Sequence, residues 1–314
     1  MGTPLLWVGF NLFVLLAIAV DLGVFHRKAH KISIREAAVW SAVWIAFAMA
    51  FGYFVYHWHG PTRGIQYFTG YVIEKALSVD NLFVFLVIFR AFQVDEKVQH
   101  RVLAWGILGA LIMRGIMIAA GAALISRFHW IIEVFGIFLI YTSIHMLWKR
   151  DKEVHYEKNP VFHFASTHLR VTKEYHGANF FVRQAGQRFA TPLFLVLLVV
   201  EITDITFAVD SIPAIFGITQ DAFIVYTSNV FAILGLRALY FLLADLLDYL
   251  RYLGIGLAIV LMFVGVKMII ERWYDVSELV SLAVVFGILI VTALLSLWAG
   301  PKKKPLAATP AERT

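Results

Sequence analysis

Long apolar runs, separated by polar segments, occupy most of this chain. Each run has about 20 residues, the length that an α-helix needs to cross a hydrocarbon layer of about 30 Å. The runs do not alternate between apolar and polar residues, as the strands of a membrane barrel do. The pattern therefore predicts an all-α polytopic membrane protein with nine transmembrane helices. These are Pro4–Phe25, Ala37–Tyr56, Tyr67–Phe89, Val102–Ile125, Trp130–Trp148, Ala190–Phe216, Ala222–Ala244, Tyr252–Ile270 and Leu279–Ala299.

Composition agrees with this class. Of the 314 residues, 61% are hydrophobic and 15% are charged, whereas soluble domains are about 25% charged. These values exclude a soluble enzyme, a disordered chain and a fibrous repeat, and we expect no enzymatic activity. The chain has no cysteine, which excludes disulfides, thiol catalysis and Cys-ligated zinc. The net charge of +6 is expected of a lipid-embedded protein with basic cytoplasmic loops, and it does not indicate nucleic-acid binding.

The distribution of Lys and Arg predicts the orientation of the chain. With the N-terminus outside, 20 of the 27 basic residues fall in inside segments, 3 fall outside and 4 lie within helices. Because cytoplasmic loops are enriched in basic residues, we expect a cytoplasmic C-terminus in the inner membrane. A polar cytoplasmic loop at 149–188 separates five predicted helices from four, and the tail at 300–314 is expected to be disordered.

Nine ionisable residues lie well inside the predicted helices. They are the acids Glu74, Asp80, Glu201, Asp204 and Asp210 and the bases Lys75, Arg114, Arg237 and Lys267. An unpaired charge at the centre of a membrane helix costs about 2.5–3.5 kcal/mol, so such groups face one another, water or a bound cation. Five acids against four bases favour a cation site over a closed network of ion pairs.

The acids form two similar motifs, in which an acid is followed six residues later by Asp. One runs from Glu74 to Asp80-Asn81 and the other from Asp204 to Asp210-Ser211. Further matches follow in the same order: Ile107-Leu108-Gly109 with Ile233-Leu234-Gly235, Arg114 with Arg237, and Ser143–Met146 with Gly265–Met268. Since three helices make one copy, the second copy enters the membrane from the opposite side. We predict an inverted repeat whose acidic motifs meet near the midplane.

This repeat divides the chain into segments. Two N-terminal helices lie in 4–56, the three-helix units in 67–148 and 190–270, and a final helix in 279–299. Residues six apart on a regular helix point about 120° apart. Both acids of one motif therefore reach the same ion only if the helix kinks or unwinds, or if water intervenes. Pro213 predicts such a break in the sixth helix.

The donor groups of the two motifs are carboxylates, an amide and hydroxyls. Oxygen donors suit Mg²⁺, Ca²⁺ or Mn²⁺. No histidine lies in either motif, which argues against an imidazole-based zinc or copper site. The bases Lys75, Arg114, Arg237 and Lys267 are interpreted as counter-charges, with Arg114 and Arg237 holding the empty site together.

These motifs resemble those of a known family. Gly70–Lys75 with Ser78–Asn81 resembles the first signature of the TerC family of integral membrane proteins, and Glu201–Asp204 with Phe207–Ile215 resembles the second. Phe180–Arg183 and Phe231–Ala238 also look like blocks of this family, and the likeness is greatest to its bacterial Alx-like branch.

The resemblance implies manganese export and manganese homeostasis, with Mn²⁺ as the transported ion and no permanent cofactor. It also implies that Glu74, Asp80, Glu201, Asp204 and Asp210 bind the metal, and that Asn81 and Ser211 join them by motif position. Redox modulation has been attached to the family as well. Without a cysteine or a cofactor motif, nothing in this sequence supports direct redox chemistry.

Together with this resemblance, the acidic motifs predict a manganese exporter that works by alternating access, with proton antiport as the means of metal release. A calcium-type cation transporter is one alternative. A membrane scaffold or assembly factor is another, and it predicts that Asp210→Asn leaves function intact. An intramembrane hydrolase with Asp80 and Asp210 as its dyad ranks last, because a dyad requires neither the three further acids nor the repeat.

Overall fold

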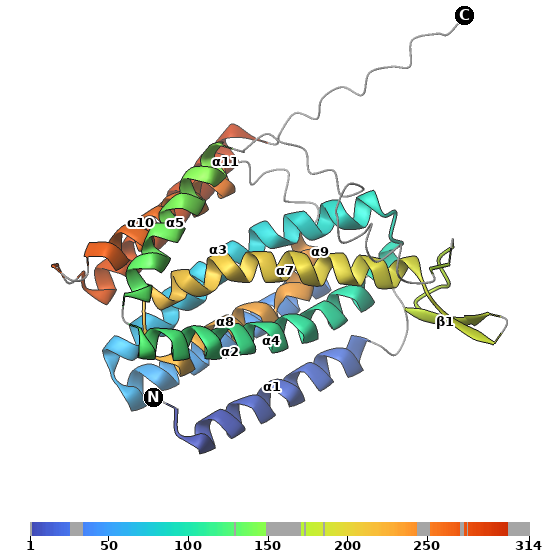
Figure 1. Cartoon of the computed structure of the whole chain (residues 1–314), viewed down its shortest axis with the longest axis horizontal. Coiled ribbons are helices and arrows are strands. Elements are labelled where there is room, and N and C mark those ends of the chain that lie inside the picture. Colours follow the sequence, from blue (N-terminus) through green and yellow to red (C-terminus); the bar gives the residue numbers. More distant parts are fainter. Residues whose placement is uncertain are drawn as a thin grey trace, which may run out of the picture.

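The computed structural model describes residues 2–25, 34–128, 130–148, 171–172, 174–184, 186–243, 252–270, 273–274 and 276–300, without the side chains at 21–25, 80, 83 and 243. The predicted tail beyond Gly300 and most of the predicted loop at 149–188 lie outside these residues. The elements in Figure 1 are α1 (Pro4–Phe25), α2 (Ile34–His59), α3 (Pro61–Ala91), α4 (Glu96–Arg127), α5 (Ile131–Trp148), β1 (Phe181–Gln184), β2 (Gln187–Ala190), α7 (Pro192–Phe216), α8 (Ala222–Leu234), α9 (Leu236–Leu243), α10 (Leu253–Ile270) and α11 (Glu278–Ala299).

Most of these helices suit a membrane. Within the described part of the chain, six are long and apolar enough to cross one, namely α2, α4, α5, α7, α10 and α11. The α8–α9 pair, which is bent by 41°, makes a seventh if it is one span. α1 is a shorter apolar helix over Pro4–Val20. α3 is not among these candidate spans, and it carries Glu74, Lys75 and Asp80 in its middle. The helical membrane fold is confirmed, and the count of nine spans stays a prediction.

The helices form two groups. In Figure 1, α2, α3, α4, α7 and α8 run alongside one another, while α5, α10 and α11 are inclined to them. α5 and α10 pack closely at two glycines. A Cβ on Gly136 would lie 2.9 Å from the carbonyl oxygen of Gly265, and a Cβ on Gly265 would lie 2.7 Å from that of Gly136. The lack of side chains at both positions lets the two backbones approach.

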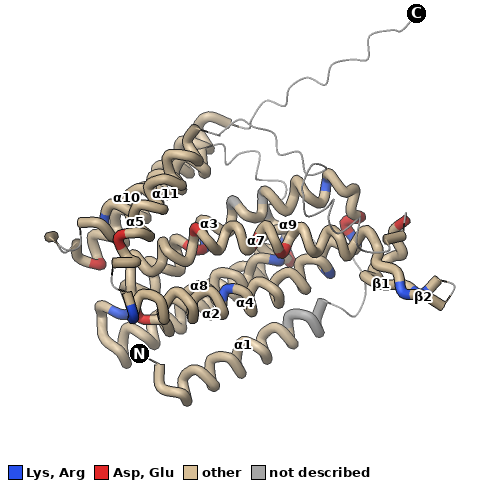
Figure 2. The backbone as a smooth tube through the Cα atoms, viewed as in Figure 1, with Lys and Arg blue, Asp and Glu red and all other residues tan. Residues whose placement is uncertain are grey.

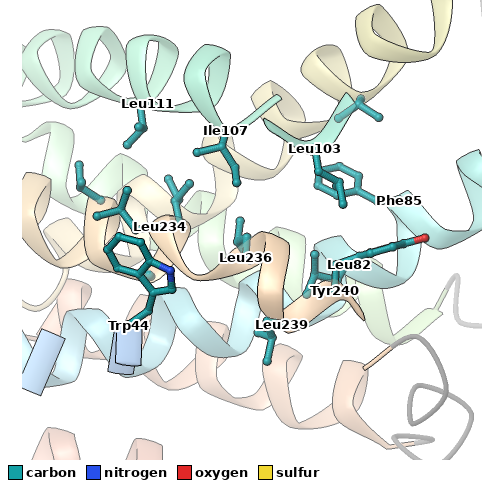
Figure 3. Packing of buried hydrophobic residues seen from close by; sticks show 14 of the residues in the cluster. Trp44, Leu82, Phe85, Leu103, Ile107, Leu111, Leu234, Leu236, Leu239 and Tyr240 are labelled. Carbon is teal, nitrogen blue, oxygen red and sulfur yellow. The ribbon is translucent and has the colours of Figure 1, made fainter. Parts of the chain in front are cut away.

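The largest apolar core fills the first group of helices. Figure 3 shows Trp44 of α2, Ile107 of α4 and Leu234 at the end of α8 among its side chains. Leu82 and Tyr240 extend the same core along α3 and α9. Because this core surrounds the contact of α3, α4, α7 and α8, any charged group placed there is separated from water.

The helix break predicted at Pro213 is wrong, because α7 continues through Pro213 to Phe216. Pro213 has no N–H to donate to the carbonyl oxygen of Val209, but the loss of this one bond does not end the helix, which continues to Phe216. α3 is also one continuous helix. The bend instead lies at Gly235, between α8 and α9, where a Cβ would sit 3.1 Å from Cβ of Trp44 and 3.2 Å from Nζ of Lys75.

The segment before α7 contains a hairpin that the sequence analysis did not predict. β1 and β2 are antiparallel, with Phe181 opposite Ala190 and Gln184 opposite Gln187. Gly186 in the turn has φ +79°, a conformation that favours glycine. α7 then begins at Pro192, two residues later than predicted, because the strand continues to Ala190 and proline suits the first helical position.

Candidate functional site

Charged residues are sparse along the helices. Figure 2 shows long stretches of tube without charge, and isolated acidic and basic positions along α3, α4 and α7. The basic residue at the centre of the site is Arg114 of α4, which is only 1% exposed. Its Nε donates to Oδ2 of Asp204 at 3.2 Å, and its Nη2 donates to Oδ1 at 3.1 Å. Nη1 donates to Oε1 of Glu74. One guanidinium therefore joins carboxylates from α3 and α7.

Two further polar side chains complete this cluster. Nη1 of Arg114 lies 2.8 Å from Oδ1 of Asn229 and 3.4 Å from Oγ of Ser211. Asn229 was not among the predicted site residues, although a single amide within the apolar run of α8 is a signal that could have identified it. We call Glu74, Arg114, Asp204, Ser211 and Asn229 the Arg114 cluster.

The Arg114 cluster has unused hydrogen-bonding capacity. Oε2 of Glu74, Nδ2 of Asn229 and Oγ of the neighbouring Ser78 are buried and make no hydrogen bond in the described part of the chain. Buried polar atoms rarely remain without a partner. Two carboxylates also exceed one guanidinium by one negative charge when all are ionised. Oxygen donors with excess negative charge suit a hard divalent cation.

The other predicted ligands with described side chains, Glu201, Asp210 and Asn81, make no hydrogen bond to Arg114. Glu201 is one turn before Asp204 on α7, and its carboxylate fills the space where a Cβ on Gly109 of α4 would be. Asp210 accepts a hydrogen bond of 3.3 Å from Oγ1 of Thr142 on α5. Asn81 is buried in α3 and is not a partner of Arg114. The side chain of Asp80 lies outside the described residues.

Of the four predicted acids whose side chains are described, the structure joins two, Glu74 and Asp204, through Arg114. No group of three or more Asp, Glu, His or Cys side chains suited to a metal occurs among the residues that are described. The physical reason is helix continuity. Since α3 and α7 are not unwound, side chains six residues apart on either helix point in different directions.

The remaining bases occupy three separate places. Nζ of Lys75 donates to the carbonyl oxygen of Ala232 at 3.1 Å, beside the α8–α9 bend. Arg237 is buried and lines, with Asp204, a cavity of about 20 Å³, which is room for about one water molecule. Lys267 is buried on α10 and lies 3.5 Å from Oε2 of Glu278, at the start of α11.

The two glycines that the sequence comparison matched, Gly109 and Gly235, have related surroundings. Gly109 of α4 makes room for the carboxylate of Glu201 on α7, and Gly235 makes room for the ammonium of Lys75 on α3. In each case the glycine faces a charged side chain on another helix, α7 for Gly109 and α3 for Gly235. These charged groups therefore lie where α4 meets α7 and where α3 meets the α8–α9 bend.

These observations define a helical integral membrane protein with ionisable groups buried where α3, α4, α7 and α8 meet. The model of the integral membrane protein TerC family matches residues 59–304, and the chain belongs to this family. This confirms the family to which the sequence motifs pointed.

Relatives cover nearly the whole chain. An uncharacterised membrane protein of Myxococcus xanthus is 50% identical over 95% of this chain and 93% of its own length. A protein of Escherichia coli K12 named provisionally as a membrane-bound redox modulator, Alx, is 45% identical over 95% and 96%. A membrane protein of Rickettsia bellii is 37% identical over 91% and 94%. No solved structure matches the chain.

Proposed function

We propose that this protein exports divalent metal ions, manganese above all, across the bacterial cytoplasmic membrane. The observation that carries this proposal is the Arg114 cluster, in which one buried guanidinium links Glu74 of α3 to Asp204 of α7. Ionisable groups at membrane depth are rare and mark ion pathways. Family membership agrees with a location in the membrane, where such groups are buried.

In this proposal Arg114 is the internal cation of the metal-free site. Its guanidinium stands between the two carboxylates, so a divalent ion that binds both must displace it. Asn229 and Ser211 then lose their contact with Arg114 and offer oxygen atoms to the metal. Glu201, Asp210 and Asp80 would line the path by which the ion reaches or leaves the cluster.

The proposal includes nine membrane spans, an external N-terminus and the inverted repeat. The helix contacts support the repeat, because α3 packs on α8 as α4 packs on α7, and the third helices α5 and α10 pack on each other. A two-fold relation between the units would produce this pattern. Alternating access would then move the α5–α10 pair relative to α3 and α7.

Coupling to protons follows from the energy of export. An inside-negative potential opposes the exit of two charges by about 4.6 kcal/mol at 100 mV. Export therefore needs a driving ion, and carboxylates that exchange Mn²⁺ for protons would supply one. The transporter would act as a cation–proton antiporter.

Transport in proteoliposomes tests this function. Purified protein should move Mn²⁺ when a pH gradient is imposed, and Asp204→Asn or Glu74→Gln should abolish the flux. Asp95→Asn is the matched control, because Asp95 is an exposed helix cap and Asn caps equally well. Equal flux in the wild type and both site variants would overturn the proposal. Flux without dependence on the gradient would remove the antiport step alone.

Cellular manganese content provides a second measurement. Expression of the wild type should lower it, and expression of Asp80→Asn or Asp210→Asn should not. Equal content in all strains, together with partner proteins that co-purify, would favour the membrane scaffold instead.

A further inference from the structure

The β1–β2 hairpin, which follows Phe180, plays no part in the proposed transport. It is nevertheless held firmly against the helices. In Figure 1 the hairpin projects beyond the ends of α4 and α7. The Phe180 ring contacts Trp105 of α4 at 6.5 Å between centroids, and the Arg101 guanidinium lies 5.4 Å from the same ring. Phe181 contacts Phe194 of α7 at 4.5 Å. The hairpin is therefore a fixed extension of these two helices.

Two arginines on this hairpin stand directly opposite each other. The register pairs Arg183 of β1 with Arg188 of β2, and both side chains are exposed. Directly opposite residues in an antiparallel pair have Cβ atoms about 4.5–5.5 Å apart, and like charges there repel. Neither arginine forms an ion pair with any residue that the structure describes. The hairpin thus concentrates two positive charges on one face.

An anion between the two arginines would turn this repulsion into attraction. The planar guanidinium fork matches the oxygen atoms of a phosphate, to which it donates two parallel hydrogen bonds. Two such forks on opposite strands can hold one phosphate group from both sides. The chemistry of the pair therefore favours a phosphate over a carboxylate-bearing side chain, which would satisfy only one fork.

The position of the pair favours a lipid as the source of that phosphate. β2 ends at Ala190, and the membrane-crossing helix α7 begins at Pro192. A strand rises about 3.3 Å per residue, which keeps Arg188 close to the helix start. Phe181 lies on the same face of the hairpin as Arg183 and is 56% exposed, and Trp105 is 52% exposed. Exposed aromatic rings beside basic groups are typical of the membrane interface.

We propose that Arg183 and Arg188 together bind the phosphate of an anionic phospholipid at the membrane surface where α7 enters the bilayer. Figure 2 shows basic positions at the β1–β2 hairpin, apart from the charges within the helix bundle. The site is separate from the Arg114 cluster, and its occupation does not depend on which ion the protein transports.

Lipid binding to the purified full-length chain tests the proposal. Native mass spectrometry in detergent, with added phosphatidylglycerol or phosphatidylcholine, counts the lipids retained by each variant. We expect the wild type to bind phosphatidylglycerol about tenfold more tightly than Arg183→Gln/Arg188→Gln, with a smaller difference for phosphatidylcholine, whose choline cation offsets the charge of the same phosphate. Arg127→Gln is the matched control, since Arg127 is exposed at the opposite end of α4. Arg183→Lys/Arg188→Lys should be intermediate, because it keeps the charge and loses the forks.

Three results would overturn the proposal. Equal phosphatidylglycerol binding by the wild type and the double glutamine variant would show that the pair contributes nothing. An equal loss in Arg127→Gln would show a general charge effect. Displacement of the lipid by millimolar inorganic phosphate would identify a site for free phosphate. If the double variant does not fold, the single Arg188→Gln variant serves, with a smaller loss expected.

Discussion

The second helices of the two proposed units, α4 and the α8–α9 pair, carry similar residues but differ in shape. α4 is continuous from Glu96 to Arg127, whereas a bend of 41° separates α8 from α9 at Gly235. Both have a glycine that faces a charged side chain of the other unit. At Gly109 this group is the carboxylate of Glu201, and at Gly235 it is the ammonium of Lys75.

The sign of the facing charge explains the difference. In a regular helix the carbonyl oxygen of Ala232 would accept from the backbone N–H of Leu236. At the bend, Nζ of Lys75 donates to this oxygen instead. An ammonium can replace a lost backbone donor in an apolar interior, and a carboxylate cannot. The helix therefore bends where a buried lysine is available, and it stays regular where the neighbour is an acid.

The largest change in the free energy of unfolding is expected for a substitution in α4, the continuous helix. Arg114→Ala should lower the free energy of unfolding by about 3–5 kcal/mol, because it leaves the Glu74 and Asp204 carboxylates buried without a counter-charge. Denaturant unfolding in detergent measures this. Added Mn²⁺ should restore part of the loss, since a cation can take the place of the guanidinium.

Arg127→Ala is the control on the same helix, because Arg127 is exposed at its end. Its effect should stay within about 0.5 kcal/mol. Similar losses in both variants would contradict the central role of Arg114. A loss in Arg114→Ala that Mn²⁺ does not reduce would argue against a metal site between the carboxylates.

The bend should depend on Lys75. Lys75→Met keeps most of the side-chain length but leaves the Ala232 carbonyl without its donor, which costs about 1–3 kcal/mol. Hydrogen exchange over 232–239 should change with it, as the α8–α9 junction rearranges. Lys97→Met is the control, since Lys97 is exposed. Unchanged exchange at the junction would show that the bend does not need the ammonium.

The sequence identified the charged residues of this site but did not predict the helix bend, Asn229 or the hairpin, and each omission has a physical reason. Charges within apolar runs are visible in any membrane sequence, which is why Glu74, Arg114 and Asp204 were identified. The bend at Gly235 was missed because it depends on Trp44 and Lys75, which reach it from other helices. Asn229 carries no charge and stands outside both motifs. The hairpin was missed because each strand has only four residues.

The smallest effect, and the most direct test of the comparison, is expected of the two glycines. Alanine favours a regular helix over glycine by about 1 kcal/mol. In Gly109→Ala this gain offsets the displacement of the flexible Glu201 carboxylate, so the free energy of unfolding should change by less than about 0.5 kcal/mol. In Gly235→Ala the bend gives no such gain, and the new Cβ crowds Trp44 at 3.1 Å.

Gly235→Ala should therefore lower the free energy of unfolding by about 1 kcal/mol, within the range of a small overpacking change. Denaturant unfolding of both variants under one condition supplies the measurement. Equal effects would mean that the two junctions are equivalent and that the bend has another cause. A larger loss of stability in Gly109→Ala than in Gly235→Ala would contradict this expectation. It would show that the contact between α4 and Glu201 is more rigid than the α8–α9 bend.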